Sequence, residues 1–141
     1  TLVFLGGRRT IQKKTVKSAM NRIHGAPFRL AVSGFGKFKR NGGDIHWAGV
    51  EKSEPLFSVQ KQLSEELVKA GFSLEERAYS PHLTLGREIR LRDPSANIYA
   101  SLSQVKKEMN VTRISLMKSE RIKGILTYTE IFGRDLTNGE D

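Results

Sequence analysis

The chain has 141 residues, of which 38% are hydrophobic, and this length suits one domain with a buried core. It contains no cysteine, which excludes disulfides, thiolate metal sites and a thiol nucleophile, and no apolar run approaches the roughly 20 residues that span a bilayer. We therefore expect one soluble, cytoplasmic domain over residues 1–141.

The positive charge of the chain is concentrated near its start. The formal net charge is +9, and residues 1–43 carry ten Lys or Arg and no acid, whereas residues 44–141 carry fourteen bases and fifteen acids. This asymmetry indicates a polyanionic partner such as a nucleic acid, whose phosphates attract Lys and Arg regardless of sequence. The alternative is a solvated basic helix face that aids solubility.

The first part of the chain predicts a strand, a helix and a β-hairpin. Residues 1–6, TLVFLG, have strand character. Residues 10–24 have the period of an amphipathic helix, whose apolar side is formed by Val16, Ala19, Met20 and Ile23. Residues 28–38 and 44–51 alternate apolar and polar positions, and the turn-forming residues between them predict a hairpin.

The second part predicts two more helices and three more strands. A helix begins after Ser53 and ends at Gly71, and its apolar side is formed by Leu56, Val59, Leu63, Leu67 and Ala70. A further helix is expected at Asn97–Met109, and strands are expected at Tyr79–Arg87, Val111–Lys118 and Leu126–Phe132. This order predicts an α+β fold in which helices pack on antiparallel sheets.

A histidine and a threonine alternate on the strand that contains SPHLTLGR. Residues at i and i+2 of a strand share a face about 7 Å apart, so His82 and Thr84 point the same way, and Leu83 and Leu85 are expected to point into the core. An imidazole can move a proton near neutral pH, and a hydroxyl can donate to an oxygen that gains charge. Taken alone, however, the His-x-Thr pattern favours the plainer interpretation that His82 is a polar residue on a half-exposed strand.

The wider sequence resembles the two-histidine (2H) phosphoesterases. The motif HLTLGR follows YSP and a helix ending LVKAGFSLEER, and it precedes ISLMKSE and YTEIFG. This order resembles the RNA 2′,3′-cyclic phosphodiesterases, also called 2′-5′ RNA ligases, in which two His-x-Thr-x motifs face one cleft. The resemblance covers nearly the whole chain. It implies two pseudo-symmetric antiparallel sheets that flank a central cleft, with helices on the outside.

The opening TLVFLGG resembles the end of the first motif of that family. Thr1 is then the motif threonine, and the first motif histidine belongs two residues before Thr1, outside this sequence. The usual first strand and helix of the family are also missing. We therefore expect an N-terminally incomplete domain, which is inactive alone because the loss of one proton-transfer group costs about 10² to 10⁴ in rate.

The resemblance implies hydrolysis of a terminal RNA 2′,3′-cyclic phosphate to a 2′-phosphate, and by reversal the joining of 2′-5′ linkages. His82 accepts a proton from water, and Thr1 and Thr84 bind the non-bridging oxygens. Arg87 lies across the pleat by strict alternation and reaches the phosphate only if the strand ends or bulges at Gly86; otherwise it is a surface salt-bridge partner. No cofactor and no metal are implied.

The remaining histidines and the partners complete these expectations. His24, at a helix end, and His46, beside Trp47, are interpreted as structural. The expected partner is RNA with 2′,3′-cyclic phosphate ends, such as tRNA fragments or nucleotides, and no membrane. One alternative is a non-catalytic module that binds RNA ends, and another is a protein-interaction module with a basic face.

Overall fold

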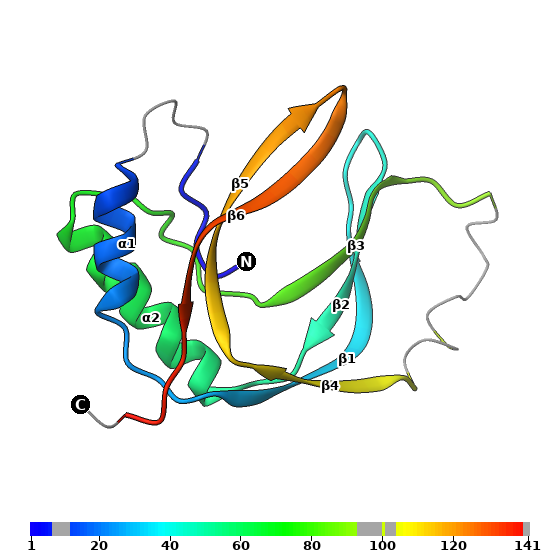
Figure 1. The fold of residues 1–141 in the computed structure, drawn as a ribbon. Coiled ribbons are helices and arrows are strands. Elements are labelled where there is room, and N and C mark those ends of the chain that lie inside the picture. Colours follow the sequence, from blue (N-terminus) through cyan, green and yellow to red (C-terminus); the bar gives the residue numbers. More distant parts are fainter. Residues whose placement is uncertain (7–11, 93–99, 101–103, 140–141) are drawn as a thin grey trace. The chain divides into compact units, whose positions relative to one another are not determined.

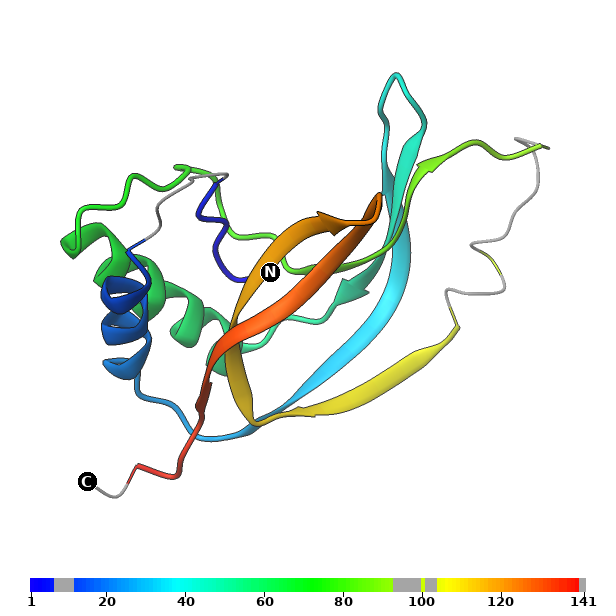
Figure 2. The ribbon, with the colours of Figure 1, turned by 45° about the horizontal axis from the view of Figure 1, so that its top comes forward.

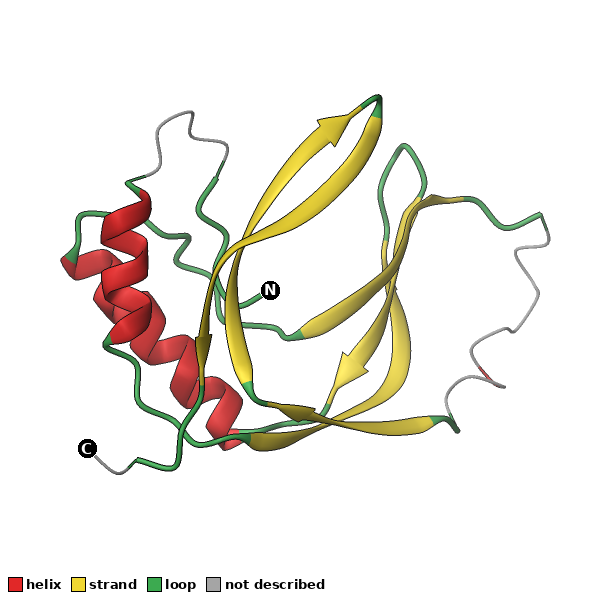
Figure 3. Cartoon of the chain, viewed as in Figure 1, coloured by secondary structure: helices red, strands yellow, loops and turns green. Residues whose placement is uncertain are grey.

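The computed structural model of the chain describes residues 1–6, 12–92, 100 and 104–139 (Figure 1). Figure 3 distinguishes its helices from its strands. In chain order the elements are α1 (Lys13–Asn21), β1 (Phe28–Phe38), β2 (Asp44–Val50), α2 (Glu54–Lys69), β3 (His82–Ile89), β4 (Lys106–Val111), β5 (Arg113–Ile122) and β6 (Ile125–Asp135).

These elements form two compact units. The sheet unit contains β1 to β4, and the helix unit contains α1, α2 and the β5–β6 hairpin. The ranges of the sheet unit are Thr1–Leu2, Arg29–Glu54 and Arg77–Asn110; those of the helix unit are Val3–Phe28, Pro55–Glu76 and Val111–Asp141.

The sheet unit is one antiparallel sheet with the strand order β3-β2-β1-β4. The predicted hairpin is confirmed, because β1 pairs antiparallel with β2 in a register that sets Gly36 opposite Trp47. A bulge follows Val32 in β1, where Gly34 has a φ of +77°, a left-handed value that a glycine adopts without a Cβ clash. The hairpin therefore supplies the two central strands beside β3.

The helix unit is built from the apolar helix faces that the sequence predicts. The predicted apolar residues of the first helix are all buried, with exposed fractions of 3% or less: Val16, Ala19 and Met20 lie on α1, and Ile23 follows its end. On α2 the buried residues are Leu56, Val59, Leu63 and Leu67. Both faces follow the 3.6-residue period, because side chains three and four residues apart lie on one side of a helix.

Gly71 ends α2, as predicted. Its φ is +98°, and two backbone hydrogen bonds close the last turn, from Gly71 N to Val68 O at 3.0 Å and from Phe72 N to Leu67 O at 3.0 Å. This pair of bonds is a Schellman motif, which a left-handed residue after the helix makes possible.

The β5–β6 hairpin carries an ion-pair network around Arg113. The Arg113 guanidinium donates to the carboxylates of Glu130 and Asp135, each at 2.9 Å, and Ser115 Oγ donates to Glu130 at 2.6 Å. The hydrogen bond from Arg113, followed by that from Ser115, lowers the pKa of Glu130, and the hydrogen bond to Glu130 raises the pKa of Arg113. The network ties the two strands together across the ladder.

Two predicted elements are wrong in whole or in part. Residues 1–6 form no strand, and Phe4 is 76% exposed, because strand propensity alone does not provide the neighbour that a ladder requires. Of the helix predicted at Asn97–Met109, residues 106–109 belong to β4, and residues 97–99 and 101–103 lie outside the described residues.

Sheet pairing explains why β4 replaces the end of that predicted helix. The strand joins the free edge of β1. Its side chains then reach neighbours far along the chain, since Lys106 pairs with Glu51 at 3.4 Å and Glu108 pairs with Arg29 at 3.5 Å. The hydrogen-bonded pairing with β1 is the long-range interaction that outweighs a local helical period, and these exposed ion pairs add little to it.

The α+β class with two antiparallel sheets is confirmed. The central cleft and its pseudo-symmetry stay predictions. Within the part of the chain that the structure describes, every helix is too short or too polar to cross a bilayer.

Candidate active site

His82 is the first residue of β3, which is an edge strand of the sheet. It directly follows Pro81, and proline is tolerated at the start of an edge strand because it lacks a backbone donor. β3 pairs antiparallel with β2, with Gly49 opposite His82 and Trp47 opposite Thr84. Cross-strand partners share a face, so His82 and Thr84 lie on the face that carries Trp47.

The strand β3 is irregular on both sides of Gly86, next to Arg87. Trp47 is opposite Thr84, but its neighbour His46 is opposite Gly86, so two steps along β3 match one step along β2. Gly86 therefore lies on the His46 face, and a second irregularity follows between Gly86 and Ile89, where Glu88 has a φ of +56°, so strict alternation does not hold at Arg87. The bulge thus supplies the condition under which Arg87 was expected to reach a phosphate. Arg87 is exposed and makes no ion pair with any described carboxylate.

The imidazole of His82 is half-buried and held by one hydrogen bond. Its Nδ1 lies 2.8 Å from the carbonyl oxygen of Ser80. A carbonyl only accepts, so Nδ1 carries the proton, and in the neutral ring the lone pair is on Nε2. The hydrogen bond therefore fixes both the ring orientation and the tautomer that a general base requires.

Two aromatic rings flank this imidazole. Phe38 meets it edge to face, with ring centroids 5.3 Å apart and an interplanar angle of 86°, and the Trp47 centroid lies 6.4 Å away. The indole lies over Gly36, where a Cβ would overlap it, so this position requires glycine. Among the described residues the indole Nε1 finds no hydrogen-bond partner although it is buried, which is uncommon for a donor and marks this face as a functional candidate.

The prediction that Leu83 and Leu85 point into the core is wrong. They are 42% and 59% exposed. Leu83 lies opposite the buried Ala48 of β2. Because β3 is an edge strand, only β2 lies beside it, and the other edge of β3 leaves its side chains open to solvent. Leu85 is the extra residue between the two paired positions of the bulge, where regular alternation is interrupted.

Thr1 belongs to the same compact unit as β3. In both ribbon views the N-terminal end of the chain lies beside the start of β3 (Figures 1 and 2). The side chains of Thr1 and Thr84 are exposed. The structure therefore places Thr1 in the unit that carries His82, and the roles of both threonines stay predictions.

The other two histidines are held as parts of the fold. His24 is exposed, and its backbone N–H and carbonyl form hydrogen bonds of 2.9 Å with the side-chain amide of Gln62 on α2. His46 is 6% exposed in β2. Tyr79, three residues before His82, has a pKa raised by burial, so its phenol is protonated at neutral pH. Within the described ranges, no three His, Asp or Glu side chains are grouped to hold a metal ion.

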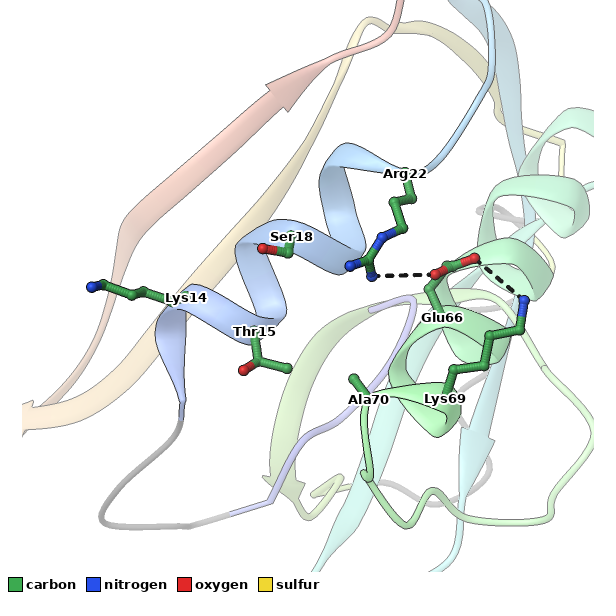
Figure 4. A pocket seen from close by; sticks show the side chains of 7 residues that line it. All are labelled: Lys14, Thr15, Ser18, Arg22, Glu66, Lys69 and Ala70. Atoms are coloured by element: carbon green, nitrogen blue, oxygen red, sulfur yellow. Dashed lines mark hydrogen bonds and ion pairs between the residues drawn. The ribbon is translucent and has the colours of Figure 1, made fainter.

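A pocket of about 510 Å³ lies between α1 and α2 in the helix unit (Figure 4). Arg22 and Lys69 both form ion pairs with the carboxylate of Glu66, at 3.4 Å and 3.6 Å. Glu66 therefore neutralises part of the positive charge of the pocket. None of the predicted site residues lines it; the lining residues are Lys14, Thr15, Ser18, Arg22, Glu66, Lys69 and Ala70. The ion pair between Arg22, the C-cap of α1, and Glu66 connects the two helices, whereas Lys69 and Glu66 both belong to α2, and we interpret the pocket as part of the helix packing.

Curated proteins similar to this chain are RNA 2′,3′-cyclic phosphodiesterases. The chain is 37% identical over 109 residues to that of Methanothermobacter thermautotrophicus, covering 74% of this chain and 59% of the relative. It is 34% identical over 91 residues to that of Geobacillus stearothermophilus, covering 62% and 29%, and 43% identical over 68 residues to that of Thermotoga maritima, covering 47% and 36%. The chain thus spans less than two thirds of the length of each.

Solved structures share the fold. E. coli LigT complexed with 3′-AMP matches with a TM-score of 0.76 at 23% identity, covering 98% of this chain and 76% of that one. TT0787 of Thermus thermophilus matches with a TM-score of 0.74 at 22% identity, covering 99% and 78%. The family model of the 2′-5′ RNA ligase superfamily matches residues 1–123. The chain therefore belongs to the 2′-5′ RNA ligase superfamily.

Proposed function

We propose that this protein hydrolyses terminal RNA 2′,3′-cyclic phosphates to 2′-phosphates. The observation that carries the proposal is the pair of His82 and Thr84 on one face of β3, followed by a bulge at Leu85–Gly86 that interrupts strict alternation before Arg87. An imidazole, a hydroxyl and a guanidinium are a proton acceptor, a neutral donor and a cation. Together they are the groups that attack on a phosphate ester requires. The named relatives support the same reaction.

His82 is the general base in this proposal. Its Nδ1–H donates to Ser80, so the lone pair of Nε2 accepts a proton from the attacking water. The new P–O bond forms as the bond from phosphorus to the ribose 3′-oxygen breaks. The 3′-oxygen takes up a proton from a second acid, which the family resemblance assigns to a histidine two residues before Thr1.

Thr84, Thr1 and Arg87 stabilise the charge that develops on phosphorus oxygens. As phosphorus becomes five-coordinate, the non-bridging oxygens gain negative charge, and donors that are already oriented stabilise this charge without reorganisation. The two threonine hydroxyls donate to these oxygens, and Arg87 offers a planar cation with several N–H donors. When the 5′-hydroxyl of a second RNA replaces water as the nucleophile, the same loss of the 3′-oxygen leaves a 2′-5′ linkage, which is the ligase activity.

The reaction is tested with a dinucleotide that ends in a 2′,3′-cyclic phosphate and with the full-length protein. We expect a 2′-phosphate product, identified by phosphorus NMR. His82→Ala is expected to lower kcat by about 10² to 10⁴, as the loss of one general base does. His24→Ala is the matched control, because that exposed histidine uses only its backbone to bind Gln62.

Two results would contradict the proposal. One is an unchanged kcat in His82→Ala, and the other is a 3′-phosphate product. Salt-sensitive RNA binding without any turnover would instead support the non-catalytic RNA-end binder.

A further inference from the structure

A second group of cations lies on the sheet unit beyond the candidate active site. We name Lys39, Arg40, Arg90 and Arg92 the distal basic cluster. All four side chains are exposed, and none makes an ion pair with a described carboxylate. One nearby acid, Asp44, is already engaged by Lys37 at 3.8 Å and by the backbone N–H of Arg40 at 3.2 Å. No described carboxylate therefore forms an ion pair that balances the positive charge of the cluster.

The fold brings the members of the cluster together from two segments. Lys39 and Arg40 follow β1, and Arg90 and Arg92 follow β3. The two segments adjoin, because Asp44 pairs with Ile89 and a Cβ on Gly43 would lie 2.6 Å from the backbone carbon of Glu88. Both ribbon views show the β1–β2 turn beside the end of β3 (Figures 1 and 2).

Phe38 connects this cluster to His82. One side of its ring meets the imidazole, with centroids 5.3 Å apart, and the guanidinium carbon of Arg40 lies 5.7 Å from the same ring centroid. The cluster then continues along β3. Arg90 is eight positions after His82, at most about 26 Å away on an extended strand, a span that several nucleotides of a single strand can follow.

Exposed cations from two adjoining segments, with the partly exposed Phe38 beside Arg40, fit a single-stranded nucleic acid. Its phosphates recur along the strand and attract Lys and Arg, while aromatic rings and guanidinium planes stack on bases. We propose that the distal basic cluster binds the nucleotides that precede the cyclic phosphate, so that the preferred substrate is an RNA oligonucleotide rather than a nucleotide. This inference rests on the proposed function, because it places the reacting end at His82.

The test compares two substrates that share the same end. One is a dinucleotide and the other an RNA of about twelve nucleotides, both with a 2′,3′-cyclic phosphate. The variant is Lys39→Gln/Arg90→Gln/Arg92→Gln, in which Arg40 stays so that Phe38 is not disturbed. The matched control, Lys61→Gln/Lys107→Gln/Lys123→Gln, removes the same charge from exposed lysines that make no ion pair with described residues.

We expect the cluster variant to lower kcat/KM for the longer RNA by about tenfold at low salt and to change the dinucleotide reaction by less than about twofold. The slope of log(kcat/KM) against log[salt] should become shallower by about 2, since each phosphate contact on a single strand contributes about 0.7. Equal losses on both substrates, no loss on the longer RNA, or an equal loss in the control would overturn the inference.

Binding separates the failure of this inference from the failure of the proposed function. Fluorescence anisotropy with the same RNA ending in a 3′-phosphate requires no turnover. Weaker binding by the cluster variant alone would support the inference even where hydrolysis is not observed, which would contradict only the proposed function. Equal binding by all proteins, or tighter binding of poly-glutamate than of RNA, would overturn the inference itself.

Discussion

The sheet unit and the helix unit divide stability and chemistry between them. Of the thirteen buried apolar side chains among the described residues, eleven belong to the helix unit, and only Leu30 and Ala48 belong to the sheet unit. The sheet unit instead carries the candidate site, with a half-buried imidazole and exposed Thr84 and Arg87. Burial stabilises a fold, whereas reacting groups must stay accessible, so the two roles are expected to respond to different substitutions.

The largest effect is expected in the core of the helix unit. Leu67 is 1% exposed, so Leu67→Ala removes buried methyl groups and leaves a cavity. The free energy of unfolding should fall by about 2 to 5 kcal/mol. Chemical denaturation measures it, with kcat unchanged in the folded protein. The adjacent Val68, which is 56% exposed, supplies the control Val68→Ala. A comparable loss in both variants would contradict the assignment of Leu67 to the core.

The next effect is expected on kcat and not on the free energy of unfolding. Thr84→Val replaces a donor by a methyl group of similar shape, and the loss of one such donor costs about 10² to 10³ in kcat. Because Thr84 is exposed, the free energy of unfolding should change by less than about 0.5 kcal/mol. Thr84→Ser retains the hydroxyl and should recover most of the rate. A serine variant as slow as the valine variant would exclude the hydroxyl as the acting group.

A smaller effect, on both stability and kcat, is expected at Gly36. In Gly36→Ala the new methyl group overlaps the indole of Trp47, whose ring also contacts His82. We expect a loss of about 1 to 3 kcal/mol in the free energy of unfolding, as overpacking costs, together with a lower kcat. Gly42→Ala is the control, since a Cβ there meets nothing within 4 Å. If stability falls while kcat is retained, the indole does not position His82.

The smallest effect concerns pH. The pKa of Glu130 is lowered from its ordinary value of 4.5 by the hydrogen bonds from Arg113 and Ser115. Its stabilising contribution is therefore fully present above pH 4.5 and is lost as the pH falls through the lowered pKa.

Unfolding measured at several pH values across this acid range checks the contribution of Glu130. Glu130→Gln should be less stable than the original protein above pH 4.5, and the difference should shrink below it. Glu65→Gln, at an exposed glutamate with no ion pair among the described residues, is the control. If the difference in stability between Glu130→Gln and the original protein grew as the pH fell, the prediction would be contradicted.

Prediction from sequence succeeded where a pattern is local. The apolar faces of α1 and α2, the stop at Gly71 and the β1–β2 hairpin depend on side chains a few residues apart, and all are present. It failed where a distant partner decides, as in residues 106–109, which pair with β1, and in residues 1–6, which pair with no strand. Both segments contain the local sequence signal on which the prediction was based. That signal does not specify whether a neighbouring strand forms hydrogen bonds with the segment.

The candidate site shows the same division within one strand. The residue types His82 and Thr84, two apart, determine that an imidazole and a hydroxyl share a face, because strand alternation has a period of two. Whether Arg87 can join them depends on the register between β2 and β3, which only the tertiary structure sets, through the irregularities on both sides of Gly86. Side-chain chemistry is therefore readable along the chain, whereas the face that a later residue occupies depends on the strand beside it.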